Sequence, residues 1–159
     1  MKSRKESVDI YDCLRLDSQQ KKLEVGNEWY CSVCKDHQLA TKQLQIYKLP
    51  EVLIVHLKRF KQSGYFTDKI GKKIDFPIEG LDMTPFIAPQ SPEGPAIYDL
   101  YAVSNHYGSL SFGHYTAFCE NYLDGKWYEF DDSSVTPVRD MSEVQTEAAY
   151  VLCYRRRMA

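Results

Sequence analysis

The chain has 159 residues, a formal net charge of −2, 43% hydrophobic and 26% charged residues, and five cysteines. This is enough apolar material for one globular domain or a large piece of one, and the charge provides no basic field for nucleic acid or an anionic membrane. No apolar run approaches the roughly 20 residues of a membrane span. No apolar signal region opens the chain, so we expect a cytoplasmic or nuclear protein with reduced or metal-bound thiols.

The first predicted element is a short helix over residues 7–16. Ser7 is a plausible N-cap, Asp9 favours the first turn, and Ile10 and Leu14 share one face. Residues 1–6 are expected to be a flexible or expression-derived start.

The rest of the chain is typical of strands. Strands are predicted at 44–46, 51–60, 66–70, 73–76, 98–104, 114–121, 126–130 and 148–154. The run 51–60 is the strongest candidate for a central strand, and Asp124-Gly125 predicts a turn. Residues 77–95, rich in Pro, Gly and Ser, predict a surface connection with at most one helical turn, and 142–145 predicts another turn. These elements indicate an α+β fold with a mostly antiparallel sheet.

A histidine stands at the mouth of one strand, in Gly113-His114-Tyr115. If the following loop has four residues, Asp131 lies opposite Thr116, on the same face as His114 and one diagonal away, roughly 7–8 Å at Cα. A carboxylate there fixes the imidazole tautomer, and the imidazole can deprotonate a Cys or Ser nucleophile. A tighter loop moves Asp131 one pair further away. Taken alone, the pair favours the alternative of a strand-end histidine and turn aspartates without chemistry.

Two cysteines, Cys31 and Cys34, have the spacing of a zinc knuckle, in which two thiolates of one turn reach one ion. A closed zinc site needs four ligands, and no second Cys-x-x-Cys exists in the chain. His37 is a less favoured third ligand. A lone cysteine pair without its metal partners is the alternative.

Taken together, these segments resemble the C-terminal half of the catalytic domain of ubiquitin-specific proteases. The matching stretches, in the family's order, are 29–42, 49–60, 102–108, 113–117, 127–133 and 149–154. Each stretch is weak evidence, but the ordered set is specific and covers most of the chain from Ser7. The resemblance points to the multi-domain subgroup whose catalytic domain is split by a long insertion.

This resemblance implies a papain-like cysteine protease fold with fingers, palm and thumb. Residues 7–157 would form the C-terminal half of the catalytic domain, with 28–48 as half of the zinc-ribbon fingers and 49–157 as the palm. The implied reaction is hydrolysis of the isopeptide or peptide bond after the C-terminal glycine of ubiquitin.

The resemblance also implies roles for single residues. His114 matches the general base, Asp131 the residue that orients it, and Asp132 a second acidic position. Cys31 and Cys34 match one half of a structural zinc site, and 58–60 matches a structural palm strand. The positions that match the channel for ubiquitin's C-terminal tail are His106, Tyr107, Gly113 and Tyr115.

The sequence departs from the family pattern in lacking the Cys box that carries the nucleophile and a nearby oxyanion-hole Asn. Cys119 shares a strand with His114 but lies five residues on, so it faces the other side. Cys153 is expected in the core, and Cys13 on the first helix. A second departure is Asp17, where the family usually carries an aromatic residue.

We therefore expect one part of a deubiquitinating thiol protease whose nucleophile lies outside this chain. Its expected partners are ubiquitin, ubiquitinated proteins and the N-terminal half of the same domain, and not nucleic acid or membrane. One alternative is a catalytically inactive ubiquitin-binding module. Another is a zinc-ribbon interaction module, against which the lone cysteine pair argues. Half of a core should also expose apolar surface where the other half would sit.

Overall fold

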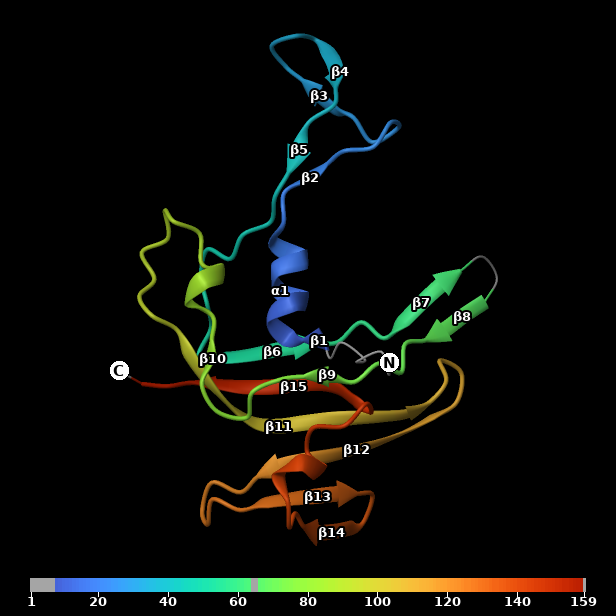
Figure 1. Cartoon of the computed structure of the whole chain (residues 1–159), viewed down its shortest axis with the longest axis vertical. Coiled ribbons are helices and arrows are strands. Elements are labelled where there is room, and N and C mark those ends of the chain that lie inside the picture. Colours follow the sequence, from blue (N-terminus) through green and yellow to red (C-terminus); the bar gives the residue numbers. More distant parts are fainter. Residues whose placement is uncertain (1–7, 64–65, 159) are drawn as a thin grey trace, which may run out of the picture.

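The computed structural model describes residues 8–63 and 66–158. Its body is a seven-stranded antiparallel sheet with the order β14-β13-β12-β11-β15-β6, and β10 pairs with β11 (Figure 1). The strands are β6 (Val52–His56), β10 (Leu81–Asp82), β11 (Ile97–Gly108), β12 (Gly113–Glu120), β13 (Trp127–Asp131), β14 (Ser134–Pro137) and β15 (Ala149–Arg156). The expected mostly antiparallel α+β fold is confirmed.

The α-helix of the described residues, α1, runs from Ile10 to Ser18. Its N-cap is Asp9, whose side chain accepts from the backbone N–H of Asp12, while the Asp12 carboxylate accepts from the N–H of Asp9. This reciprocal capping fixes the start of the helix. The helix therefore begins three residues later than predicted, and the predicted N-cap Ser7 lies outside the described residues.

One face of the sheet carries the hydrophobic core. Val103, Phe118 and Leu152 lie side by side on β11, β12 and β15 and are all buried. Ile10 of α1 belongs to the same buried cluster, so the helix covers this face. We call this side of the sheet the core face and the other side the open face.

The prediction of a central strand over residues 51–60 is wrong both in the length of the strand and in its position in the sheet. It divides into β6 and β7 (Phe60–Ser63), and β6 pairs only with β15, so it is an edge strand within the described residues. Arg59 accounts for the break between β6 and β7, because its buried guanidinium donates to the carbonyl of Ala149. Residues that are apolar on both faces are typical of a central strand, and that pattern misled the prediction.

Four small two-stranded ladders surround the sheet. They pair β1 (Val8–Asp9) with β9 (Ile74–Asp75), β2 (Lys21–Lys22) with β5 (Thr41–Lys42), β3 (Trp29–Cys31) with β4 (Asp36–Gln38), and β7 with β8 (Phe66–Lys69). The β2–β5 and β3–β4 ladders project away from the sheet (Figure 1). The strands expected at 66–70 and 73–76 are confirmed in shorter form. The strand expected at 44–46 is wrong, because Ile46 forms only an isolated bridge to Ile87.

The connection 77–95 contains the expected helical turn, η1 (Thr84–Phe86), but it is not wholly a surface segment. Leu81, Met83 and Ala88 are buried. A second helical turn, η2 (Met141–Glu143), lies close to its predicted position. The structure also contains β14, a strand that was not predicted. No helix in 8–63 or 66–158 has the length and apolar character to cross a membrane.

Candidate active site

The pairing of β12 with β13 brings a histidine and an aspartate together. Ala117 lies opposite Phe130, and the Asn121 N–H donates to the carbonyl of Lys126 across a four-residue loop. Continued by one pair, this register sets Thr116 opposite Asp131, as the four-residue loop predicted. Nε2 of His114 lies 2.5 Å from Oδ1 of Asp131, which is a short charge-assisted hydrogen bond.

This hydrogen bond decides which nitrogen of His114 is free. An ionised carboxylate only accepts, so Nε2 must carry the hydrogen, and the lone pair of the neutral ring is at Nδ1. The hydrogen bond to Asp131 is the main cause that raises the pKa of His114, and the charges of Asp131 and Asp132 add to it. Both side chains of the pair are about half exposed, so a partner group can reach Nδ1.

Asp132 occupies a left-handed conformation, with φ of 48°. It is the first residue of the two-residue turn that joins β13 to β14, because Asp131 pairs with Ser134. Aspartate tolerates this conformation better than most residues with a β-carbon. The turn brings the carboxylate of Asp132 close to the pair, so that donor atoms of His114, Asp131 and Asp132 all lie within 4.8 Å of one another.

Two of the four residues expected to bind the tail of ubiquitin form an aromatic wall on the open face. His106 on β11 lies opposite Tyr115 on β12, with ring centroids 4.7 Å apart. Two further rings join them: Tyr150 at 5.6 Å and Phe60 at 5.5 Å from the His106 ring. We call these four residues the aromatic wall. Tyr107 pairs with His114 and is half exposed.

Tyr150 is not among the predicted site residues, and Phe60 is predicted only as part of a structural strand. Ser104 pairs with Val151 but Asn105 pairs with Ala149, so Tyr150 is the extra residue of a β-bulge. A bulge changes which face a residue occupies, and no signal in the sequence marks it.

Gly113 lies against the ring of His106. A β-carbon at this position would overlap Nε2 of His106 and come 2.8 Å from the carbonyl oxygen of Tyr107. His106 is buried, its Nδ1 has no hydrogen-bond partner among the described residues, and burial is the main cause that lowers its pKa, followed by the charge of Lys69. Lys69 donates from Nζ to the carbonyl of His106 at 2.5 Å, which ties β8 to the wall.

Cys31 and Cys34 lie in the β3–β4 hairpin, away from the His114 pair. The N–H of Cys34 points at Sγ of Cys31 at 3.5 Å, and this is the main cause that lowers the pKa of the Cys31 thiol. A thiol that ionises readily suits a metal ligand. His37 instead packs edge-on against Tyr30, and within the described chain no third donor joins the two thiols. The pair therefore fits two ligands of a zinc site and not a closed one.

The other three thiols have raised pKa values. Burial is the main cause for Cys13, Cys119 and Cys153. Cys119 lies opposite Tyr128 on the open face, whereas His114 and Asp131 belong to the core-face side of the same strands. Within the described residues, the His114 ring forms its hydrogen bond with Asp131 and not with a thiol.

Curated proteins resemble the chain over nearly all its length. It is 49% identical over 154 residues to ubiquitin carboxyl-terminal hydrolase 15 of Homo sapiens, and 46% identical over 156 residues to ubiquitin carboxyl-terminal hydrolase 4 of Mus musculus. These matches cover 97% and 98% of the chain but only 16% of each relative. The chain thus spans about a sixth of the length of these relatives.

Solved structures agree with this similarity. A chain of the SAGA Ubp8/Sgf11/Sus1/Sgf73 DUB module bound to ubiquitin aldehyde has a TM-score of 0.82 and 32% identity, over 98% of this chain and 35% of that one. A chain of a SAGA DUB module bound to monoubiquitin gives the same TM-score with 34% identity, over 98% of this chain and 34% of that one. The family described as ubiquitin carboxyl-terminal hydrolase matches residues 6–154. The chain belongs to the ubiquitin carboxyl-terminal hydrolase family.

Proposed function

We propose that this chain is one part of a deubiquitinating thiol protease, in which His114 is the general base and Asp131 orients it. The observation that carries this proposal is the hydrogen bond from Nε2 of His114 to Asp131, which leaves Nδ1 free as the basic atom. Members of the family are deubiquitinating cysteine proteases, and a Cys–His pair oriented by a third group is the arrangement such proteases need.

The proposed reaction has two steps. Nδ1 of His114 accepts the proton of a cysteine thiol, and the thiolate attacks the carbonyl carbon of the last glycine of ubiquitin. The C–N bond breaks, the amine leaves with the proton from His114, and a thioester remains. Water then attacks the thioester, with His114 accepting its proton and returning it to the thiol. Asp131 stabilises the imidazolium in both steps.

The nucleophilic cysteine of this scheme comes from sequence outside the chain. Support comes from the five thiols described above: three have raised pKa values, and Cys31 and Cys34 lie in a projecting hairpin. Family relatives are much longer than this chain, so they have room for a nucleophile elsewhere.

Ubiquitin is the proposed ligand of the surface next to His114, and ubiquitinated proteins are the substrates. His106 and Tyr115 of the aromatic wall, with Tyr107 and Gly113 at the adjacent strand ends, would line the path of the C-terminal tail. Solved relatives are described as bound to ubiquitin aldehyde and to monoubiquitin, which supports this assignment. Asp132 would add negative charge beside the imidazolium.

Zinc is proposed as a structural cofactor. Cys31 and Cys34 would supply two of four ligands, and the other two would come from the rest of the domain. The ion would hold the projecting hairpin rigid and takes no part in the chemistry. We further propose that the protein works in the cytoplasm, the nucleus or both.

The experiment uses a fluorogenic substrate on the C-terminus of ubiquitin. The chain is assayed alone and after mixing with the remaining part of the catalytic domain of the 49% identical human relative. Turnover only in the mixture, abolished by His114→Ala, is the expected result. Turnover by the chain alone would contradict the claim that the nucleophile lies elsewhere. Ubiquitin binding without turnover in either sample would favour a ubiquitin-binding module.

A further inference from the structure

His114, Asp131 and Asp132 bring together one nitrogen donor and two oxygen donors. One donor atom from each side chain lies within 4.8 Å of the other two. Within residues 8–63 and 66–158, no other three side chains of histidine, cysteine, aspartate or glutamate gather in this way. Imidazole and carboxylate are ligands that zinc and related transition-metal ions take in proteins. We call these three residues the donor set.

The donor set has more negative than positive charge. Among the described residues, no arginine or lysine forms an ion pair with Asp131 or Asp132, and the partner of Asp131 is the His114 ring. The two carboxylates stabilise a positive charge on that ring: the hydrogen bond to Asp131, and then the charges of Asp131 and Asp132, raise the pKa of His114. The same carboxylates would stabilise a divalent cation more strongly, because it carries twice the charge.

Solvent reaches the donor set. The side chains of His114 and Asp131 are 48% and 51% exposed, and Asp132 is exposed as well. An ion can therefore enter without any rearrangement of the sheet. Three protein ligands leave a tetrahedral zinc ion with one coordination position for water.

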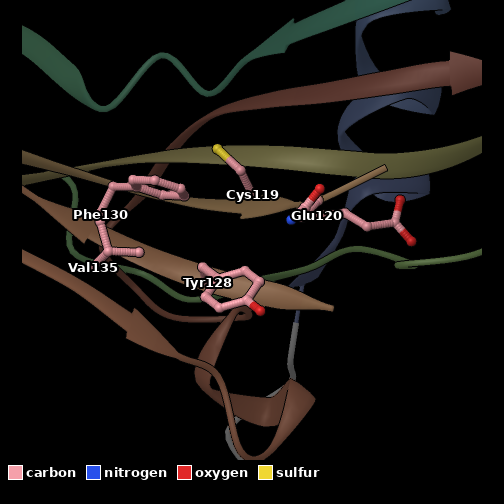
Figure 2. Close-up of a pocket in the computed structure, with 6 residues that line it drawn as sticks. Cys119, Glu120, Tyr128, Phe130 and Val135 are labelled. Carbon is pink, nitrogen blue, oxygen red and sulfur yellow. The ribbon is translucent and has the colours of Figure 1, made fainter. Parts of the chain in front are cut away.

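Within the described chain, the open face of the same strands offers fewer donors. A hollow of about 350 Å³ lies there over β12, β13 and β14, and Figure 2 shows the side chains of Cys119, Phe130 and Val135 turned toward it. Its lining contains one thiol, from Cys119, and one carboxylate, from Glu120. The metal-ligating side chains of these strands are therefore gathered on the side of His114.

An ion in the donor set competes with the hydrogen bond between His114 and Asp131. Nε2 of His114 lies 2.5 Å from Oδ1 of Asp131, and the hydrogen lies between them. A tetrahedral zinc ion with bonds of about 2.0–2.2 Å holds two ligand atoms roughly 3.3 Å apart. The ion must therefore replace the hydrogen on Nε2 and move the two side chains apart by about 1 Å.

Replacement of this hydrogen changes which nitrogen of the ring is basic. A neutral imidazole that binds a metal through Nε2 carries its hydrogen on Nδ1. A neutral His114 ring thus exchanges its hydrogen through solvent from Nε2 to Nδ1, and an imidazolium releases one proton to solvent. In both cases Nδ1 has no free lone pair, so it cannot accept the proton of a thiol.

We propose that His114, Asp131 and Asp132 bind a divalent transition-metal ion, with Zn²⁺ as the representative, and that the bound ion reversibly blocks His114 as a base. The imidazole favours such an ion over Mg²⁺ and Ca²⁺, which take oxygen ligands. The blocking rests on the proposed function of His114, whereas the binding of the ion does not.

The binding test uses Zn²⁺ as the probe and Mg²⁺ as the second probe. Cys31→Ser and Cys34→Ser are introduced together, so that the thiols of the β3–β4 hairpin take no zinc. NMR of the His114 ring nitrogens reports which of them carries hydrogen, and calorimetry measures the affinity. Asp132→Asn removes one charged ligand and keeps the pair of His114 and Asp131. The matched control is Asp17→Asn, which removes the same charge from an exposed residue of α1.

Zn²⁺ should move the ring hydrogen of His114 from Nε2 to Nδ1, and Mg²⁺ at the same concentration should not. Asp132→Asn should weaken zinc binding about tenfold or more, and Asp17→Asn should leave it unchanged. A ring that keeps its hydrogen on Nε2 at saturating Zn²⁺ overturns the metal site. Equal affinity of the two variants for Zn²⁺ overturns it as well.

The blocking is tested in the mixture with the remaining part of the catalytic domain, with Cys31 and Cys34 restored. Added Zn²⁺ should slow turnover, and Asp132→Asn should raise the inhibitory concentration about tenfold, each sample being compared with its own rate without added metal. Equal inhibition of the parent and Asp132→Asn means that the ion acts elsewhere, such as on the nucleophilic thiol, and overturns the blocking. A mixture without turnover contradicts the proposed function, while the ring nitrogens still decide whether the metal site exists.

Discussion

Nε2 of His114 lies 2.5 Å from Oδ1 of Asp131, and the two residues come from neighbouring strands, 17 positions apart in the chain. The contact occupies one nitrogen of the ring and leaves the other, Nδ1, for proton transfer. Because Asp131 is the last residue of β13, its position depends on the length of the β12–β13 loop. One residue more or fewer in that loop would turn the carboxylate to the opposite face.

Asp131→Asn should lower the pKa of His114 toward its ordinary value of about 6.5. The hydrogen bond to Asp131 is the main cause of the raised pKa, and an amide provides no charge to stabilise the imidazolium. Titration of the His114 ring by NMR in the chain alone measures this shift. Asp132→Asn is the comparison, with a smaller fall, and an equal fall in the two variants would contradict the assigned roles.

The same pair predicts a pH dependence of stability. A raised folded pKa means that the charged form is stabilised by folding, so the contribution is fully present below the unfolded pKa of about 6.5. It is lost as pH rises through the folded pKa of His114. Urea unfolding of parent and Asp131→Asn should therefore differ more at pH 6 than at pH 9. A difference that grows as pH rises would contradict the assignment.

Gly108→Ala should destabilise the chain by about 1–3 kcal/mol. Gly108 has φ of +93°, and a β-carbon there would come 2.5 Å from the carbonyl oxygen of Phe112, within the loop that leads to His114. Gly94→Ala is the matched control, since its φ is not positive and a β-carbon added there would meet no atom within 4 Å. Urea unfolding compares the two, and equal stability of the variants would show that the loop tolerates an added β-carbon.

Arg59→Lys should lower the free energy of unfolding by about 2–3 kcal/mol. The buried guanidinium donates to the carbonyls of Ala149, Ile70 and Lys72 at 2.6, 3.0 and 2.8 Å, and it joins β15 to the base of the β7–β8 hairpin. A single ammonium group cannot reach all three oxygens in that geometry. The exposed Arg139→Lys serves as control, and a loss of similar size there would mean that the carbonyl contacts contribute little.

Much of the sheet could be predicted because period-2 patterns and one turn signal were enough. The strands predicted at 98–104, 114–121 and 126–130 correspond to β11, β12 and β13, and the four-residue loop gave the observed register. With that register, simple counting along two strands brought His114 and Asp131 to one face. Local information was sufficient to place both residues on one face, but it left the loop length, and with it the distance between the two side chains, open.

The remaining features depend on contacts distant in sequence. The end of β6 is set by Arg59 and its bond to Ala149, 90 residues away. Tyr150 joins the aromatic wall through a β-bulge that follows from the pairing of β11 with β15. The edge position of β6 follows from which strands the described chain contains. No pattern within a window of a few residues carries any of this information.

Asp17→Phe should stabilise the chain by about 0.5–2 kcal/mol. Asp17 is the penultimate residue of α1 and borders a hollow of about 100 Å³ whose other lining residues include Leu14, Ile46 and Phe86. An aromatic ring there would bury apolar surface against these side chains, and it would remove a negative charge from the C-terminal end of a helix, where the macrodipole disfavours it. Asp17→Asn separates the two causes, because it removes the charge without filling the hollow. Thermal and urea unfolding should rank Phe above Asn and Asn above the parent. If Asn equals Phe, the gain is electrostatic and the hollow is not filled; if Phe falls below the parent, the hollow cannot accept a ring.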